Sequence, residues 1–204
     1  MILRGQKAFE RSVDSVAKIY AVMIGLAVTE SVKTLVPKLP NGQPDFSWVS
    51  LQSGLPAFIA LLATAVPFWH GMNRHLDRCY LEKDSPVQGA LVLDFVVFLV
   101  EATLLILAGW ALRDGFITFY CLGGLLLLDV LWGFGSHQIH FPKQPSHVVS
   151  WSIINLVAGI VALGVIAYEF KWKSFLLMVI ALARSIADYG FGSDFYFPAI
   201  QEET

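Results

Sequence analysis

The sequence predicts an all-α, polytopic integral membrane protein with six transmembrane helices. Of its 204 residues, 56% are hydrophobic and only 15% are charged, and the mean hydropathy is +0.63. Soluble domains carry roughly 25% charged residues, so this chain has too little polar surface to enclose its apolar content. The apolar residues form six blocks of about the 20 residues that cross a bilayer as a helix, without the alternation of strands. We therefore expect residues 1–204 to form one transmembrane domain.

Each expected span is bounded by residues that stop a helix or turn the chain. The first ends at Pro37, and PKLPNGQPD separates it from the second. The third begins after Pro86, and a tight turn at Arg113 and Asp114 separates it from the fourth. HFPKQPSH precedes the fifth span, and a turn at Lys171 precedes the sixth. The six spans are residues 14–36, 48–69, 87–112, 115–134, 148–170 and 172–189.

The distribution of Lys and Arg indicates the orientation in the membrane. If the N-terminus is cytoplasmic, nine of the 14 basic residues lie on the cytoplasmic side and five on the other side. The nine are Arg4, Lys7, Arg11, Lys18, Arg74, Arg78, Lys83, Lys143 and Arg184, and the five are Lys33, Lys38, Arg113, Lys171 and Lys173. Short loops rich in Lys and Arg usually stay in the cytoplasm, so we expect a multi-pass protein of the cell membrane with both termini cytoplasmic.

Charged residues inside the third, fourth and sixth spans suggest an intramembrane charge network, formed by Asp94, Glu101, Asp129, Arg184 and Asp188. An unpaired charge at the bilayer centre costs about 2.5–3.5 kcal/mol on insertion scales, so we expect these groups to face the interior. Arg184 and Asp188 share one helical face, and Asp94 or Asp129 can approach from a neighbouring helix. The network either fixes the helix register or lines a hydrated path, and the sequence leaves both interpretations open.

The first span carries a stripe of small and polar residues on one helical face, at Asp14, Lys18, Ala21, Gly25 and Thr29. Such a stripe lets helices approach closely, and it also leaves room for water along a pore. We treat the five residues as pore-lining candidates, with helix packing as the alternative. On a similar stripe of the fifth span, Asn155 is suited to a hydrogen bond between helices.

Neither the histidines nor any sequence motif predicts a metal site or a catalytic site. His70, His75, His137, His140 and His147 all fall on the expected cytoplasmic side, but no spacing with Cys or carboxylates defines a tetrahedral metal site. We therefore predict no metal and no cofactor. Catalytic motifs such as HExxH and the nucleophile elbow are also missing, so we predict that the protein is not an enzyme. The net charge of −2 gives no indication of nucleic-acid binding.

A family resemblance is carried by two segments, RSVDSVAKIYAVMIGLAVTE (Arg11 to Glu30) and FWHGMNRHLDR (Phe68 to Arg78). They resemble the first helix, and the Trp- and His-containing end of the second helix, of the prokaryotic six-helix potassium channels related to the lysosomal potassium channel. In that family the first helix opens with an arginine and a Phe-Ser-Asp motif, where this chain has Ser12, Val13 and Asp14. The resemblance implies a tetramer whose first helices line a pore.

We therefore predict an oligomeric membrane protein that conducts or transports a small ion, with its pore or gate on the first helix. The alternative is a membrane-embedded sensor or effector subunit, whose cytoplasmic face binds a soluble protein and whose charge network is structural. Arg74 and Arg78, just beyond the second span, suit anionic headgroups or such a partner. The expected partners are thus the lipid bilayer, further copies of the chain and a cytosolic protein, with no nucleic acid.

Overall fold

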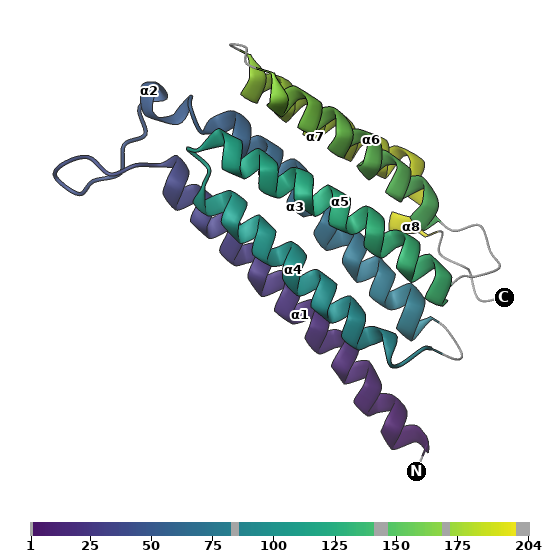
Figure 1. Ribbon diagram of the computed structural model, residues 1–204. Coiled ribbons are helices and arrows are strands. Elements are labelled where there is room, and N and C mark those ends of the chain that lie inside the picture. The colour runs from purple at the N-terminus through teal and green to yellow at the C-terminus, as the bar shows by residue number, and fades with distance from the viewer. Residues whose placement is uncertain (1, 83–85, 141–146, 169–171, 199–204) are drawn as a thin grey trace.

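The computed structural model describes residues 2–82, 86–140, 147–168 and 172–198 (Figure 1). These residues form helices and no strand, which confirms the all-α prediction. The helices are α1 (Ile2–Leu35), α2 (Trp48–Leu51), α3 (Leu55–Leu76), the π-helical turn η1 (Asp77–Leu81), α4 (Ala90–Trp110), α5 (Gly115–His140), α6 (His147–Ala167), α7 (Lys173–Phe191) and α8 (Ser193–Tyr196). Six of them are long and apolar enough to cross a membrane, so the chain is a multi-pass membrane protein.

The six long helices alternate in direction, and α1 lies at the edge of the bundle (Figure 1). Helix α1 packs against α4 and α3, α4 against α5, α5 against α6, and α7 against α6 and α3. The alternation brings the start of α1 and α8 to the same end of the bundle, which we call the terminal end. The last turns of α1, α4 and α6 lie at the opposite end. Because α1 contacts the bundle on one side only, its other face is left uncovered.

A glycine sets the closest approach between α1 and α4. A Cβ atom at Gly109 would lie 2.6 Å from the carbonyl oxygen of Ala27 and 3.2 Å from the backbone nitrogen of Ser31. Both α1 residues are completely buried. Without a hydrophobic driving force in lipid, close backbone packing of small residues is a main source of helix association. The contact at Gly109 therefore determines that the face of α1 with Ala27 and Ser31 packs against α4.

Several helices are longer than the apolar blocks that predicted them. Helix α1 starts well before residue 14, α3 continues through η1 to Leu81, and α5 continues past residue 134 to His140. Hydropathy marks the part of a helix that crosses the bilayer, whereas backbone hydrogen bonding continues until a breaker or an unfavourable turn ends it. Residues 169 and 170, the end of the fifth expected span, lie outside the described residues.

The second expected span is divided near its beginning. Its first residues form the short helix α2, and α3 begins at Leu55, with Pro56 in its first turn. Proline is tolerated there because the first-turn N–H groups have no intrahelical partner. Gly54, the residue before α3, lies against the side chain of Leu35, so the junction between α2 and α3 contacts the end of α1.

Arg113 joins the elements at the end opposite the terminal end. Its Nε donates to the carbonyl oxygen of Thr34 at 2.9 Å, and its Nη2 donates to that of Ser50 at 3.0 Å. It thereby satisfies a carbonyl in the last turn of α1, where the helix itself offers no donor. Nearby, hydrogen bonds from Ser50 and then Ser47 lower the pKa of the half-buried Asp45 carboxyl below its usual value.

Candidate functional site

Helix α7 carries Arg184 and Asp188 into the interior of the bundle. Both side chains are buried, and Arg184 Nη2 lies 3.2 Å from Asp188 Oδ2 across one helical turn. The guanidinium also lies over the ring of Phe68 from α3, 5.0 Å from its centroid. Ion pairs and cation–π contacts are both stronger away from water. The arginine therefore lies inside the chain, as its spacing from Asp188 predicts, and does not face lipid.

Asn155 of α6 links this arginine to Asp129 of α5. Arg184 Nε donates to Asn155 Oδ1 at 2.7 Å, and Asn155 Nδ2 donates to Asp129 Oδ2. All three residues are buried. An amide is suited to this position because it accepts from a cation at one end and donates to an anion at the other. Asn155 thus connects opposite charges on two helices.

Glu101 of α4 and Tyr20 of α1 extend the polar groups to the edge of the bundle. The Glu101 carboxyl lies beside the carboxyl of Asp129 and the hydroxyl of Tyr20, and all three residues are at most 2% exposed. Among the described residues, Tyr20 Oη, Glu101 Oε1 and Asp129 Oδ1 have no well-aligned hydrogen-bond partner. Buried polar atoms are usually paired, and Glu101 lies close enough to Asp129 and Tyr20 for these groups to share a proton.

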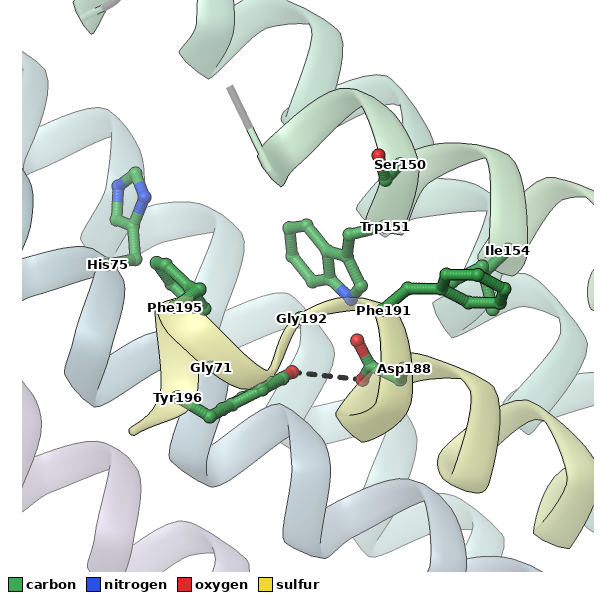
Figure 2. Close-up of a pocket in the computed structure, with 10 residues that line it drawn as sticks. All are labelled: Gly71, His75, Ser150, Trp151, Ile154, Asp188, Phe191, Gly192, Phe195 and Tyr196. Carbon is green, nitrogen blue, oxygen red and sulfur yellow. Dashed lines mark hydrogen bonds between the residues drawn. The ribbon is translucent and has the colours of Figure 1, made fainter. Parts of the chain in front are cut away.

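Tyr196 of α8 ends the series of polar groups at the terminal end. Its Oη donates to Asp188 Oδ2 at 2.9 Å, the dashed line in Figure 2. Burial, and then the neighbouring charge of Asp188, raise the pKa of Tyr196, so the hydroxyl retains the proton that this bond requires. Gly71 of α3 makes room for the ring, because a Cβ atom there would lie 3.3 Å from Tyr196 Oη.

These residues form one connected set, the interior polar chain, which crosses from α1 to α8. Its members are Tyr20, Glu101, Asp129, Asn155, Arg184, Asp188 and Tyr196. The set holds three carboxyl groups and one guanidinium, so full ionisation would leave two negative charges uncompensated in a dry interior. Like charges at close range cannot all ionise, and bound protons or cations must compensate them.

Two small cavities adjoin the interior polar chain. One, of about 30 Å³, is lined by residues that include His75, Trp151, Asp188 and Tyr196 near the terminal end (Figure 2). The other, also about 30 Å³, is mostly apolar and has Arg184 in its wall. Each has room for about one or two waters. At about 30 Å³ each, neither of these two cavities is large enough to cross the bundle.

Asp94 belongs to a separate polar group, the terminal-end cluster, formed by His75, Cys79, Tyr80, Asp94, Trp132 and His140. The Asp94 carboxylate accepts hydrogen bonds from Tyr80 Oη at 2.7 Å and from Trp132 Nε1 at 2.9 Å. It also lies 2.9 Å from Nε2 of His75. The structure therefore places Asp94 with the histidines of the terminal end, while Arg184 is bonded to Asn155 and Asp188.

The sequence analysis did not predict the terminal-end cluster, although two of its residues have a spacing that is visible in the sequence. His75 and Cys79 are four residues apart on one helix, a spacing that brings two side chains together. The remaining members come from α4 and α5, and no local pattern in those helices indicates where they meet. Of the five histidines that the sequence placed on this side, His75 and His140 join the cluster, and the side chain of His147 lies outside the described residues.

The stripe on α1 lies on its uncovered face. All five pore-lining candidates, Asp14, Lys18, Ala21, Gly25 and Thr29, are exposed in the single chain. Lys18 Nζ lies 2.5 Å from Asp14 Oδ2, and the Thr29 hydroxyl donates to the carbonyl oxygen of Gly25 at 2.8 Å. A Cβ atom added at Gly25 would meet nothing within 4 Å. The described part of the chain therefore leaves the stripe exposed along its length.

Comparison with known proteins assigns no family to this geometry. The chain matches no protein-family model, no curated protein and no solved structure. The contacts of the interior polar chain, the terminal-end cluster and the uncovered face of α1 are therefore the basis for a functional proposal.

Proposed function

We propose that the protein forms a homo-oligomer that conducts or transports a small ion across the cell membrane, along the uncovered face of α1. The observation that carries this proposal is the exposure of the complete stripe from Asp14 to Thr29 on one side of a membrane-spanning helix. Charged and polar groups that face lipid are costly, and they are normally placed toward another protein surface or water. A ring of α1 helices would provide both.

The interior of the single chain offers a poorer route for ions. The cavities beside Arg184 and Asp188 are about 30 Å³ each, and these two residues form a buried ion pair. Opening such a route would break buried ion pairs, which typically costs about 3–5 kcal/mol for each partner left unpaired. A path between subunits requires no such opening. The resemblance of Arg11 to Glu30 to the first helix of potassium channels supports the same location.

Flux into liposomes tests the proposal. Purified full-length protein is reconstituted, and the fluxes of K⁺, Na⁺ and H⁺ are measured separately. Gly25→Leu fills the stripe and is expected to reduce the flux while the oligomer stays intact. Gly164→Leu is the matched control, because Gly164 is also an exposed helical glycine at which an added Cβ atom would meet nothing within 4 Å, but it lies on α6.

The outcome separates the two hypotheses. Unchanged flux in a correctly assembled Gly25→Leu variant would move the pore away from the α1 stripe. A wild-type protein that is oligomeric and passes no ion would favour the sensor or effector subunit with a cytosolic partner. One basic residue suggested for that partner is already engaged within the chain: Arg74 donates to the carbonyl oxygen of Phe195 and pairs with Asp77 and Glu82.

A further inference from the structure

Three potential metal ligands converge at the terminal end. His75, Cys79 and His140 are buried, and one donor atom from each lies within 4.8 Å of the other two. Cys79 Sγ is 3.6 Å from His75 Nδ1. Tetrahedral Zn²⁺, with Zn–S near 2.3 Å and Zn–N near 2.0–2.1 Å, places sulfur and nitrogen ligands about 3.5 Å apart. The Cys79 and His75 atoms therefore already have nearly the separation that a shared zinc ion requires.

Asp94 supplies the support that a ligating histidine usually has. Its carboxylate lies 2.9 Å from Nε2 of His75, which leaves Nδ1 of the same ring directed toward Cys79. Metal-bound histidines typically donate their other ring N–H to a carboxylate or carbonyl, which fixes the tautomer and the ring orientation. Asp94 is itself held by Tyr80 and Trp132. The carboxylate is thus fixed by donors from two further positions.

The backbone changes its winding where the cluster forms. Residues Asp77–Leu81 form the π-helical turn η1 at the end of α3. Consecutive residues of an α-helix point about 100° apart, yet Cys79 and Tyr80 are both buried, at 0% and 3% exposure. The wider turn lets both side chains enter the bundle. Such π-helical turns occur frequently at functional sites, because they realign side chains at a cost in helix stability.

The charges of the cluster also fit a divalent cation. Among the described residues, the basic side chains within 4 Å of the Asp94 carboxylate are the imidazoles of His75 and His140. A Cys79 thiolate and the Asp94 carboxylate would together balance the two positive charges of Zn²⁺. Soft thiolate and imidazole ligands prefer Zn²⁺ over Mg²⁺ or Ca²⁺, which select oxygen ligands.

We propose that His75, Cys79 and His140 bind one Zn²⁺ ion per chain, with Asp94 orienting His75 from the outer shell. Three protein ligands leave the fourth tetrahedral position for a further ligand. The ion links α3 and η1 to α5 at the terminal end. This site does not depend on ion conduction, so it goes beyond the proposed function.

Metal titration of the full-length protein in detergent tests the site. After treatment with a chelator, the protein is titrated with Zn²⁺ and, separately, with Co²⁺. We expect one Zn²⁺ per chain and a Co²⁺ spectrum with a thiolate charge-transfer band. Cys79→Ser should lose that band, whereas Cys121→Ser, which changes the other cysteine of the chain, should retain it.

The histidine and carboxylate variants refine the result. Asp94→Asn is expected to weaken Zn²⁺ binding by roughly 10–100-fold, the usual effect of removing an outer-shell group. His140→Ala removes a ligand and should cost more than that. His137→Ala is the matched control on the same helix, outside the cluster, and should bind as the wild type does.

Two outcomes would overturn the proposal. The first is a chelator-treated wild-type protein, with an unchanged size-exclusion profile, that binds Zn²⁺ no more tightly than Cys79→Ser. The second is a wild-type Co²⁺ complex without a thiolate band, a result that does not depend on whether any variant folds. In either case the terminal-end cluster would be a hydrogen-bonded packing group around Asp94.

Discussion

The uncovered face of α1 and the inward face of α7 both carry polar groups at membrane depth, but they satisfy them differently. On α7, Arg184 is buried and bonded to Asn155 and Asp188 of the same chain. On α1, the one ion-pair partner of Lys18 among the described residues is Asp14, one turn away, and both side chains remain more than half exposed. In the first arrangement, the partners of the arginine come from the same chain. The second requires water, headgroups or another copy of the protein.

This difference shows that polar residues in a membrane span can have different structural roles. A buried polar chain holds helices in one register, and its removal strands charges in a low-dielectric interior. An exposed polar stripe contributes little to the fold of the single chain, and its role lies in what covers it. Mutations on the inward face of α7 should therefore change the stability of the fold, whereas mutations on the uncovered face of α1 should change assembly and ion flux. The expected losses of stability follow, from the largest to the smallest.

Arg184→Ala should have the largest effect on stability. It leaves the Asp188 carboxylate without its cation and removes the donor to Asn155, so we expect a loss of about 3–5 kcal/mol. Thermal melting of the detergent-purified protein measures the loss. A variant that melts like the wild type would show that the arginine is not part of a buried pair.

A second substitution sharpens this result. Asp188→Asn combined with Arg184→Ala removes the stranded charge and should recover part of the lost stability. Asp94→Asn in the same background should recover nothing, because Asp94 is bonded to Tyr80 and Trp132 in the terminal-end cluster. Equal recovery by both changes would contradict the separation into two polar groups.

Gly109→Ala should have an intermediate effect. The added Cβ would lie 2.6 Å from the Ala27 carbonyl oxygen, so α1 must move away from α4. Overpacking of this kind typically costs about 1–3 kcal/mol. The matched control is Gly25→Ala on the other face of α1, where the new methyl group meets nothing within 4 Å. Melting temperatures of the two variants check the contrast, and equal values would contradict the assignment of the two faces.

Asp14→Asn should have the smallest effect on the fold. The Asp14–Lys18 pair is exposed, and exposed pairs at this helical spacing contribute about 0.3–0.5 kcal/mol. We expect an unchanged melting temperature for the monomeric protein, measured beside its oligomeric state by light scattering. A large loss of stability would mean that the stripe is buried against something that the single chain does not supply.

Much of the fold follows from local properties of the sequence. Each span is long and apolar enough to cross a membrane by itself, and Gly and Pro mark where the chain turns. The position of Arg184 also follows from its segment, because Asp188 is one turn away and a lone charge in lipid is costly. These predictions depend only on the free energy of inserting a single helix into a bilayer.

Other features were decided by tertiary structure. Asn155 bridges Asp129 and Arg184, and Asp94 meets His75 and Trp132, because the helices are rotated to bring those faces together. Nothing in the hydropathy of α4, α5 or α6 specifies that rotation. It depends on close contacts such as the one at Gly109, and these form only after the helices have inserted and packed. The sequence therefore determined which segments cross the membrane, and packing determined which polar groups meet inside it.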